Sequence, residues 1–127
     1  MTATVLMFNL PGKKKRAVRV LSESLGFAAR EMKPEDFGKS LAALLGDEEA
    51  ASGAEAEETA FAEEMLVLCD LDAGQFHGLL DGLQEAGARI ALKASLTDTN
   101  RGWTPGRLCR ELTAEREAIE KLRRERR

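Results

Sequence analysis

The stretch MLVLCDLD at residues 65–72 decides the fold. Its first five residues form a continuous apolar run, which is typical of a strand buried on both faces of a sheet that helices cover. Asp72 follows, with Gln75 three residues later, and this spacing is a variant of the capping box that starts a helix. We therefore expect a central strand that leads directly into a helix.

The residues after this stretch complete a strand-helix-strand unit. Gly87 is placed to end the helix in a left-handed cap. Residues 89–95 then alternate between apolar and more polar side chains, as in a strand with one buried face. Because crossovers between such strands are right-handed, the two strands should be parallel. The inner face of the helix carries four large apolar residues: Phe76, Leu79, Leu80 and Leu83.

The same order of elements occurs nearer the N-terminus. Residues 5–8, VLMF, form a short apolar run that predicts a second central strand. Residues 13–25 have the spacing of an amphipathic helix, and Gly26 can end it. Residues 27–32 predict a shorter and more polar strand, which suits the edge of a sheet.

Matching positions in the two segments predict a structural repeat. Asn9-Leu10 corresponds to Asp70-Leu71, and Gly26 corresponds to Gly87. The predicted fold class is therefore α/β, with two strand-helix-strand units that form a four-stranded sheet with helices packed on it, plus a long C-terminal helix. Thr104 and Pro105 have the residue types of an N-cap and a first helical position for that last helix. The order of the strands cannot be deduced from these patterns.

The length of 127 residues favours a single domain, residues 1–127. Residues 1–46 form its first half, with a short helix expected over 35–45. Residues 47–62 are acidic and rich in small side chains, so we expect a flexible linker. Residues 63–127 form the second half.

Two segments of the second half resemble a small uncharacterised bacterial family, a domain of unknown function. They are EMLVL at residues 64–68 and LKASLTDTNRGW at residues 92–103, and the likeness extends over about residues 63–112. The family's signature is similar to L-K-A followed by T-x-T-N-x-x-W. Because that family has no assigned activity, the resemblance implies a fold and a candidate site but no reaction. The signature falls on Leu92, Lys93, Ala94, Thr97, Thr99, Asn100 and Trp103.

The same segment is the candidate ligand site on chemical grounds. It leaves the end of a strand and enters a helix, which is where open α/β sheets bind ligands. Lys93 would supply a positive charge, and Thr97, Thr99 and Asn100 would supply hydrogen bonds to a phosphate or carboxylate. Trp103 is the fifth residue of this candidate binding site. The leading hypothesis is thus a non-catalytic binding or regulatory module for a small anion or a protein.

Structural roles for these residues are the alternative interpretation. Trp103 can pack on Leu108 as a hydrophobic staple, and Thr97 and Asn100 can stabilise the loop through bonds to its backbone. A second functional hypothesis is a small phosphate-handling enzyme that uses Asp70, Asp72 and Lys93. It rests on the D-x-D pattern after the strand, although the residues that follow depart from the usual motif.

Other reactive side chains do not form a convincing site. His77 has no Cys or Ser in sequence reach, and Cys69 and Cys109 lack the spacing of a zinc motif. We expect Cys69 to be a buried apolar residue. No catalytic residue, metal site or cofactor is predicted, so an enzyme is not the favoured class.

Charge and helix patterns bear on possible partners. The 19 basic and 22 acidic residues leave a formal net charge of -3, which does not favour nucleic acid or an anionic membrane. Residues 13–16, KKKR, oppose the dipole of their helix and hint at a local anionic partner. No signal sequence or membrane span is evident, so a cytoplasmic location is expected. The C-terminal helix could join two copies in a homodimer or fray in solvent, and its heptad seam is Leu108, Leu112, Glu115, Ile119 and Leu122.

Overall fold

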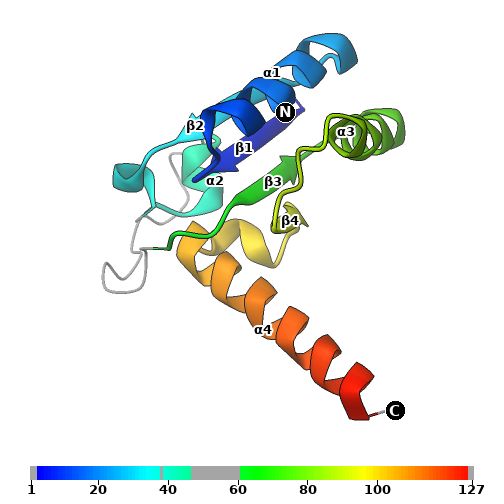
Figure 1. The fold of residues 1–127 in the computed structure, drawn as a ribbon. Coiled ribbons are helices and arrows are strands. Elements are labelled where there is room, and N and C mark those ends of the chain that lie inside the picture. The colour runs from blue at the N-terminus through cyan, green and yellow to red at the C-terminus, as the bar shows by residue number, and fades with distance from the viewer. Residues whose placement is uncertain (1–2, 38, 47–60, 126–127) are drawn as a thin grey trace. The chain divides into compact units, whose positions relative to one another are not determined.

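The computed structural model describes residues 3–37, 39–46 and 61–125 of the chain. Strands and helices alternate in the order that the sequence predicts, which confirms the α/β class (Figure 1). The elements are β1 (Thr4–Phe8), α1 (Gly12–Leu25), β2 (Ala28–Met32), η1 (Pro34–Asp36), α2 (Leu41–Leu44), β3 (Met65–Cys69), α3 (Ala73–Glu85), β4 (Leu92–Ser95), η3 (Asn100–Gly102) and α4 (Pro105–Glu125).

The chain forms two compact units that interleave along the sequence. Unit 1 consists of Met1–Lys33 and Ala62–Thr97, and unit 2 of Pro34–Phe61 and Asp98–Arg127. The sheet and its two crossover helices belong to unit 1. The single domain with two successive halves stays a prediction, and the acidic linker expected at 47–62 lies almost entirely outside the described residues.

The sheet of unit 1 has the strand order β2-β1-β3-β4. Each strand-helix-strand unit is parallel within itself, as predicted, whereas the two central strands β1 and β3 run antiparallel. The apolar runs therefore occupy the centre, and the more polar strands β2 and β4 occupy the edges. We call β1, α1 and β2 the N-terminal repeat, and β3, α3 and β4 the C-terminal repeat.

A pseudo-twofold axis relates the two repeats. Leu6 lies opposite Val67 at the middle of the β1–β3 pairing, and these two residues are 61 positions apart. The same separation links Asn9 to Asp70, which both have a φ of 59°, and it links the helix-ending glycines Gly26 and Gly87. Two non-glycine residues thus adopt the left-handed backbone conformation at matched positions, which is uncommon. The backbone therefore confirms the structural repeat that the sequence predicts.

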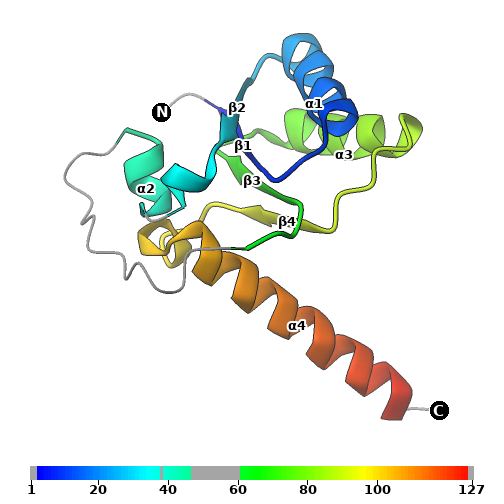
Figure 2. The same ribbon diagram turned by 60° about the vertical axis from the view of Figure 1, so that its left-hand side comes forward.

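Helices α1 and α3 lie together on one face of this sheet (Figures 1 and 2). Their core includes Val18 and Leu79, which are 61 positions apart and fully buried. The Leu25 side chain of α1 packs directly on Gly78 of α3, because a Cβ at Gly78 would lie 2.7 Å from Cδ2 of Leu25. The core on this face contains Val5, Met7, Leu10, Val18, Phe27, Leu66, Leu68, Leu79, Leu83, Ala88 and Ile90.

The side chains of β1 and β3 that point to the other face are also buried. This confirms the prediction that both apolar runs form strands enclosed on two sides. The buried side chains of β1 and β3 on that face are Thr4, Leu6, Phe8, Met65, Val67 and Cys69.

Unit 2 is built around α2 and the start of α4. The helix expected over 35–45 is divided into η1 and α2, because the Ser40 side chain accepts a hydrogen bond from Ala43 N and starts a new helix there. Thr104 caps α4 as predicted, since its hydroxyl accepts from Arg107 N at 3.2 Å. Residues 114–125 of α4 are exposed throughout. Across residues 3–37, 39–46 and 61–125, no helix is both long and apolar enough to cross a bilayer.

Candidate functional site

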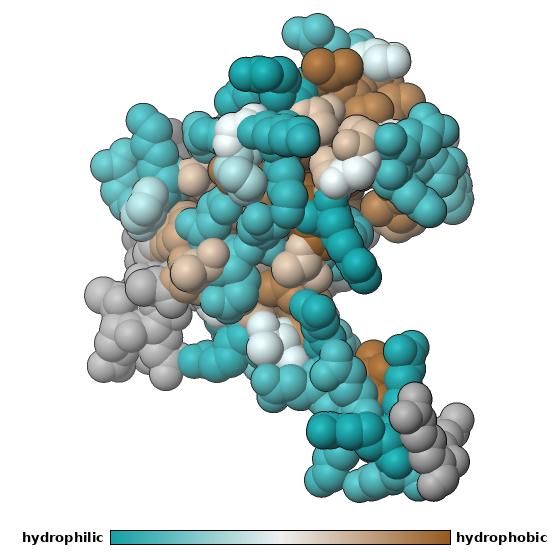
Figure 3. Space-filling view, in the orientation of Figure 1, coloured by the Kyte–Doolittle hydropathy of each residue, from teal (hydrophilic) through white to brown (hydrophobic). Residues whose placement is uncertain are grey.

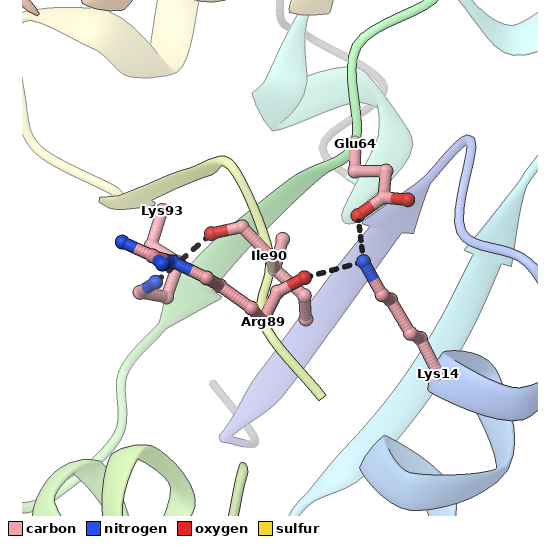
Figure 4. A network of polar contacts seen from close by, with 5 residues as sticks. All are labelled: Lys14, Glu64, Arg89, Ile90 and Lys93. Carbon is pink, nitrogen blue, oxygen red and sulfur yellow. Dashed lines mark hydrogen bonds and ion pairs between the residues drawn. The ribbon is translucent and has the colours of Figure 1, made fainter. Parts of the chain in front are cut away.

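The connection from α3 to β4 is fixed by a long-range brace. Gly87 leaves α3 with a φ of 67°, and the chain then passes Arg89 and Ile90 before β4 begins. Lys14, in the first turn of α1, donates to a carboxylate oxygen of Glu64 at 2.6 Å and to the carbonyl oxygen of Arg89 (Figure 4). The strand expected from residue 89 starts at Leu92, because the backbone of residues 89–91 does not pair with β3.

A matching brace occurs in the N-terminal repeat. Gln75 is the counterpart of Lys14, 61 residues later, and its side-chain amide donates to the carbonyl oxygens of Leu25 and Gly26 at 3.2 Å each. Each helix therefore holds the segment that follows the other helix. This reciprocity is the pattern of an isologous interface, here within one chain.

A cleft of about 650 Å³ opens beside the braced connection. The side chains of Arg89 and Lys93 line it, and both lie on the side of the connection away from Lys14 (Figure 4). Lys93 Nζ donates to the carbonyl oxygen of Ile90 at 3.1 Å, which tethers the ammonium group at the cleft. The cleft is lined by Leu80, Leu83, Gln84, Gly87, Ala88, Arg89, Ile90 and Lys93.

The electrostatics of this cleft favour an anion. Its described lining contains two cations and no aspartate or glutamate. Lys93 uses one of its three donors on Ile90, and guanidinium groups such as that of Arg89 bind phosphate and carboxylate in a bidentate way. Buried Leu83 and Ile90 form an apolar wall, where hydrogen bonds to charged groups are stronger than in water.

The predicted site residues are divided between the two units. Lys93 and Thr97 are exposed in unit 1, and Lys93 lines the cleft whereas Thr97 does not. Thr99, Asn100 and Trp103 belong to unit 2. The binding role of this set stays a prediction, and Lys93 is the member that the cleft includes.

Asn100 and Trp103 have local structural contacts within unit 2. Asn100 is buried at the start of η3, and its carbonyl oxygen accepts from Trp103 N at 2.9 Å. The Trp103 carbonyl oxygen in turn accepts from Leu41 N at 2.9 Å, and the Arg107 guanidinium lies 4.4 Å from the centre of the Trp103 ring. These contacts hold the loop before α4 against α2.

Arg89 is the site residue that the sequence interpretation missed. The signal was present, because Arg89 and Lys93 lie four positions apart in a segment expected to be a strand, and even spacing places both on one face. The family signature begins only at Leu92, so Arg89 lies outside it.

The residues of the enzyme hypothesis have other roles or surroundings. Asp72 Oδ1 accepts from Gln75 N at 2.7 Å, and Gln75 Oε1 accepts from Asp72 N at 3.0 Å, so the predicted capping box is confirmed. Cys69 is buried, and desolvation, with a contribution from the Asp70 charge, raises the pKa of its thiol to about 12. Its thiol is therefore protonated and enclosed at neutral pH. Asp70 is exposed, and within the described residues no group of three or more acidic, His or Cys side chains could hold a metal ion.

The basic run at residues 13–16 is compensated in part by the protein itself. Lys14 pairs with Glu64, and Lys15 pairs with Glu31, each at 2.6 Å. The hydrogen bond from Lys15 lowers the pKa of Glu31, with further contributions from nearby cations. Lys14 and Lys15 therefore have anionic partners within the protein, and the hint of an external anionic partner rests on Lys13 and Arg16, which are exposed.

Comparison with known proteins gives one family match. Residues 64–119 match the model of a domain of unknown function (DUF3783). The matched segment begins just before β3, ends within α4 and contains both cations of the cleft. The comparisons with curated proteins and with solved structures gave no match.

Proposed function

We propose that this protein is a non-catalytic binding module that recognises a small anionic ligand at the cleft beside the α3–β4 connection. The observation that carries the proposal is the pair of cations, Arg89 and Lys93, on a cleft whose described lining has no carboxylate. A phosphate or carboxylate group would neutralise both charges. A regulatory role in the cytoplasm fits such a module.

Preorganisation supports this proposal. The Lys14 brace fixes the backbone at Arg89, and the bond to Ile90 restrains Lys93 before any ligand arrives. Restraint of this kind reduces the entropy lost on binding. Thr97 follows β4 in the same unit and is exposed, and it stays a proposed member of the binding site.

The absence of a role in catalysis is proposed from the surroundings of Asp72, the second carboxylate of the D-x-D pattern, and of the Cys69 thiol. Asp72 holds the first turn of α3, and Cys69 is enclosed with a raised pKa. A covalent step at either residue would have to break the helix cap or open the sheet.

Isothermal titration with pyrophosphate tests this function. We expect wild-type protein to bind, and Arg89→Gln and Lys93→Gln each to weaken binding about tenfold or more, since each removes a charged hydrogen bond. Lys121→Gln on the exposed end of α4 removes the same charge and should bind as wild type does. Equal affinity in all four proteins, or no binding by wild type, would contradict the proposal.

We also propose weak self-association through the second half of α4. Ile119 and Leu122 are 53% and 57% exposed there, on one heptad seam. In a parallel pair of helices, Glu111 of one copy would face Arg116 of the other, which favours that orientation. Glu115 on the same seam limits the strength of the pair.

Light scattering at increasing protein concentration tests this second proposal. The expected result is a mass that rises with concentration for wild type and stays monomeric for the double variant Ile119→Ser, Leu122→Ser. Val20→Ser, another exposed apolar residue outside α4, is the matched control and should associate like wild type. A concentration-independent monomer in every case would exclude the pairing.

A further inference from the structure

The interface between α1 and α3 differs at its two ends, although the pseudo-twofold axis relates them. At one end, the Leu25 side chain fills the space over Gly78, where a Cβ would lie 2.7 Å from its Cδ2 atom. The counterparts of these residues at the other end are Ala86 and Ala17, each 61 positions away. Of the two equivalent positions, one therefore has a leucine, Leu25, and the other has an alanine, Ala86.

A second cleft, of about 510 Å³, lies where this leucine is missing. Ala17 and Ala86 both line it, and Leu21 and Gly82 extend its apolar surface. Val20 also lines it and is 60% exposed. Apolar side chains come to the surface over α1 and α3 in Figure 3.

Cations surround this apolar cleft. Lys13 and Arg16, both exposed, line it together with Lys14, which is paired with Glu64. The described lining includes no acidic residue and no aromatic ring. The cleft thus combines an apolar interior with two available positive charges, and its described lining has no ring on which a base could stack.

We propose that this cleft is a docking site for a partner protein that presents a leucine-like side chain flanked by carboxylates. The apolar side chain would occupy the position that Leu25 occupies at the other end of the interface. Aspartate or glutamate residues beside it would face Lys13 and Arg16. This inference goes beyond the anion cleft and does not rest on it, because it uses neither Arg89 nor Lys93.

The substitution Ala86→Leu tests the cleft in the protein alone. Ala86 is exposed at the end of α3 with a φ of −79°, so a leucine is compatible with its backbone. If the cleft accepts an apolar side chain, the new leucine should cover it and raise the Tm above that of wild type. Ala118→Leu, at an exposed helical position of α4, is the matched control and should leave the Tm nearly unchanged. A Tm for Ala86→Leu no higher than for the control would overturn the proposal.

A fluorescence anisotropy titration tests the partner chemistry. The probe is a labelled peptide in which a central leucine is flanked by glutamates on both sides. We expect wild type and Ala118→Leu to bind it, and we expect Ala86→Leu and the double variant Lys13→Glu, Arg16→Glu to lose at least about tenfold in affinity. A peptide with serine in place of the leucine should bind weakly to wild type, Ala118→Leu and Ala86→Leu, and still more weakly to the charge-reversed double variant.

Two outcomes of that titration would overturn the docking site. One is equal binding of the leucine and serine peptides to wild type, which would indicate charge attraction of the kind that an RNA oligomer also provides. The other is no binding of the leucine peptide. Either result would leave the pyrophosphate titration unaffected, so failure here is distinguishable from failure of the anion cleft.

Discussion

The N-terminal and C-terminal repeats have the same backbone path but stabilise their helices in different ways. Helix α3 begins with a local capping box between Asp72 and Gln75. Helix α1 begins after Pro11, whose side chain makes no cap, and its first turn carries three lysines that oppose the helix dipole. Two of these lysines are paired with Glu64 and Glu31, which are remote in sequence.

This difference shows how a repeated fold can acquire separate roles. The capping box makes the start of α3 self-sufficient, whereas the start of α1 depends on partners from β2 and from the residue before β3. Through Lys14, the same dependence fixes the segment that leads to the anion cleft. The C-terminal repeat has Ala86 at the position where the N-terminal repeat has Leu25, and the second cleft is open beside this smaller side chain. The second cleft thus arises where the symmetry between the repeats is broken.

The largest effect is expected where the repeats meet on the pseudo-twofold axis. Leu21 and Gly82 are counterparts and contact each other, and a Cβ at Gly82 would overlap the Leu21 side chain. Gly82→Leu would therefore displace the Leu21 side chain from the contact between α1 and α3, at a cost of about 2 kcal/mol in the free energy of unfolding. Urea denaturation measures this value.

Gly74→Leu is the control for that variant. Gly74 lies in the first turn of the same helix, and its Cβ would meet a single neighbour, Oδ1 of Asp72, at 3.4 Å. Its stability should equal or exceed that of wild type, because leucine has the higher helix propensity. Equal losses in the two variants would mean that the close approach of the helices is not what Gly82 provides.

A smaller effect is expected from removing the local cap. Asp72→Ala deletes the acceptor for Gln75 N and should lower the free energy of unfolding by about 1 kcal/mol. Asp81→Ala, an exposed acidic residue in the middle of the same helix, should change it much less. If both variants lose the same stability, the charge of α3 matters and the capping geometry does not.

The smallest effect concerns the exposed pair that replaces a cap in the N-terminal repeat. The pKa of Glu31 is lowered in the folded protein by Lys15, so the pair contributes stability above the unfolded-state pKa of Glu31 and loses it as the pH falls through the folded-state pKa. The variant Lys15→Gln should therefore be slightly less stable than wild type at neutral pH and equal to it in acid. Thermal unfolding across that pH range measures the difference in stability between the two proteins. A difference that widens in acid would contradict a stabilising pair between Lys15 and ionised Glu31.

The elements of unit 1 were predictable because their signals are local. Apolar runs, helix periodicity and the glycines Gly26 and Gly87 lie within a few residues of the structures that they specify. Asp72 and Gln75 even predicted a specific pair of hydrogen bonds. The antiparallel pairing of β1 with β3 was not predictable. It depends on which strand edges pair with each other, and the paired residues Leu6 and Val67 are 61 positions apart in the sequence.

The candidate site was predicted in part for the same reason. Lys93 was found because it belongs to a recognisable motif, whereas Arg89 gains its role from a brace by Lys14, which lies 75 residues away. The partial pairing of the basic run was missed for this reason too. Charge runs in a sequence do not reveal their long-range partners.

The most direct test of the central claim is an NMR titration of isotopically labelled protein with pyrophosphate, followed through its backbone amide resonances. Our account predicts that the amides of residues 87–93 shift together and saturate, and that Lys93→Gln reduces these shifts. Shifts confined to the loop of residues 97–103, or no saturating shift in the protein, would contradict the assignment of the anion site to Arg89 and Lys93.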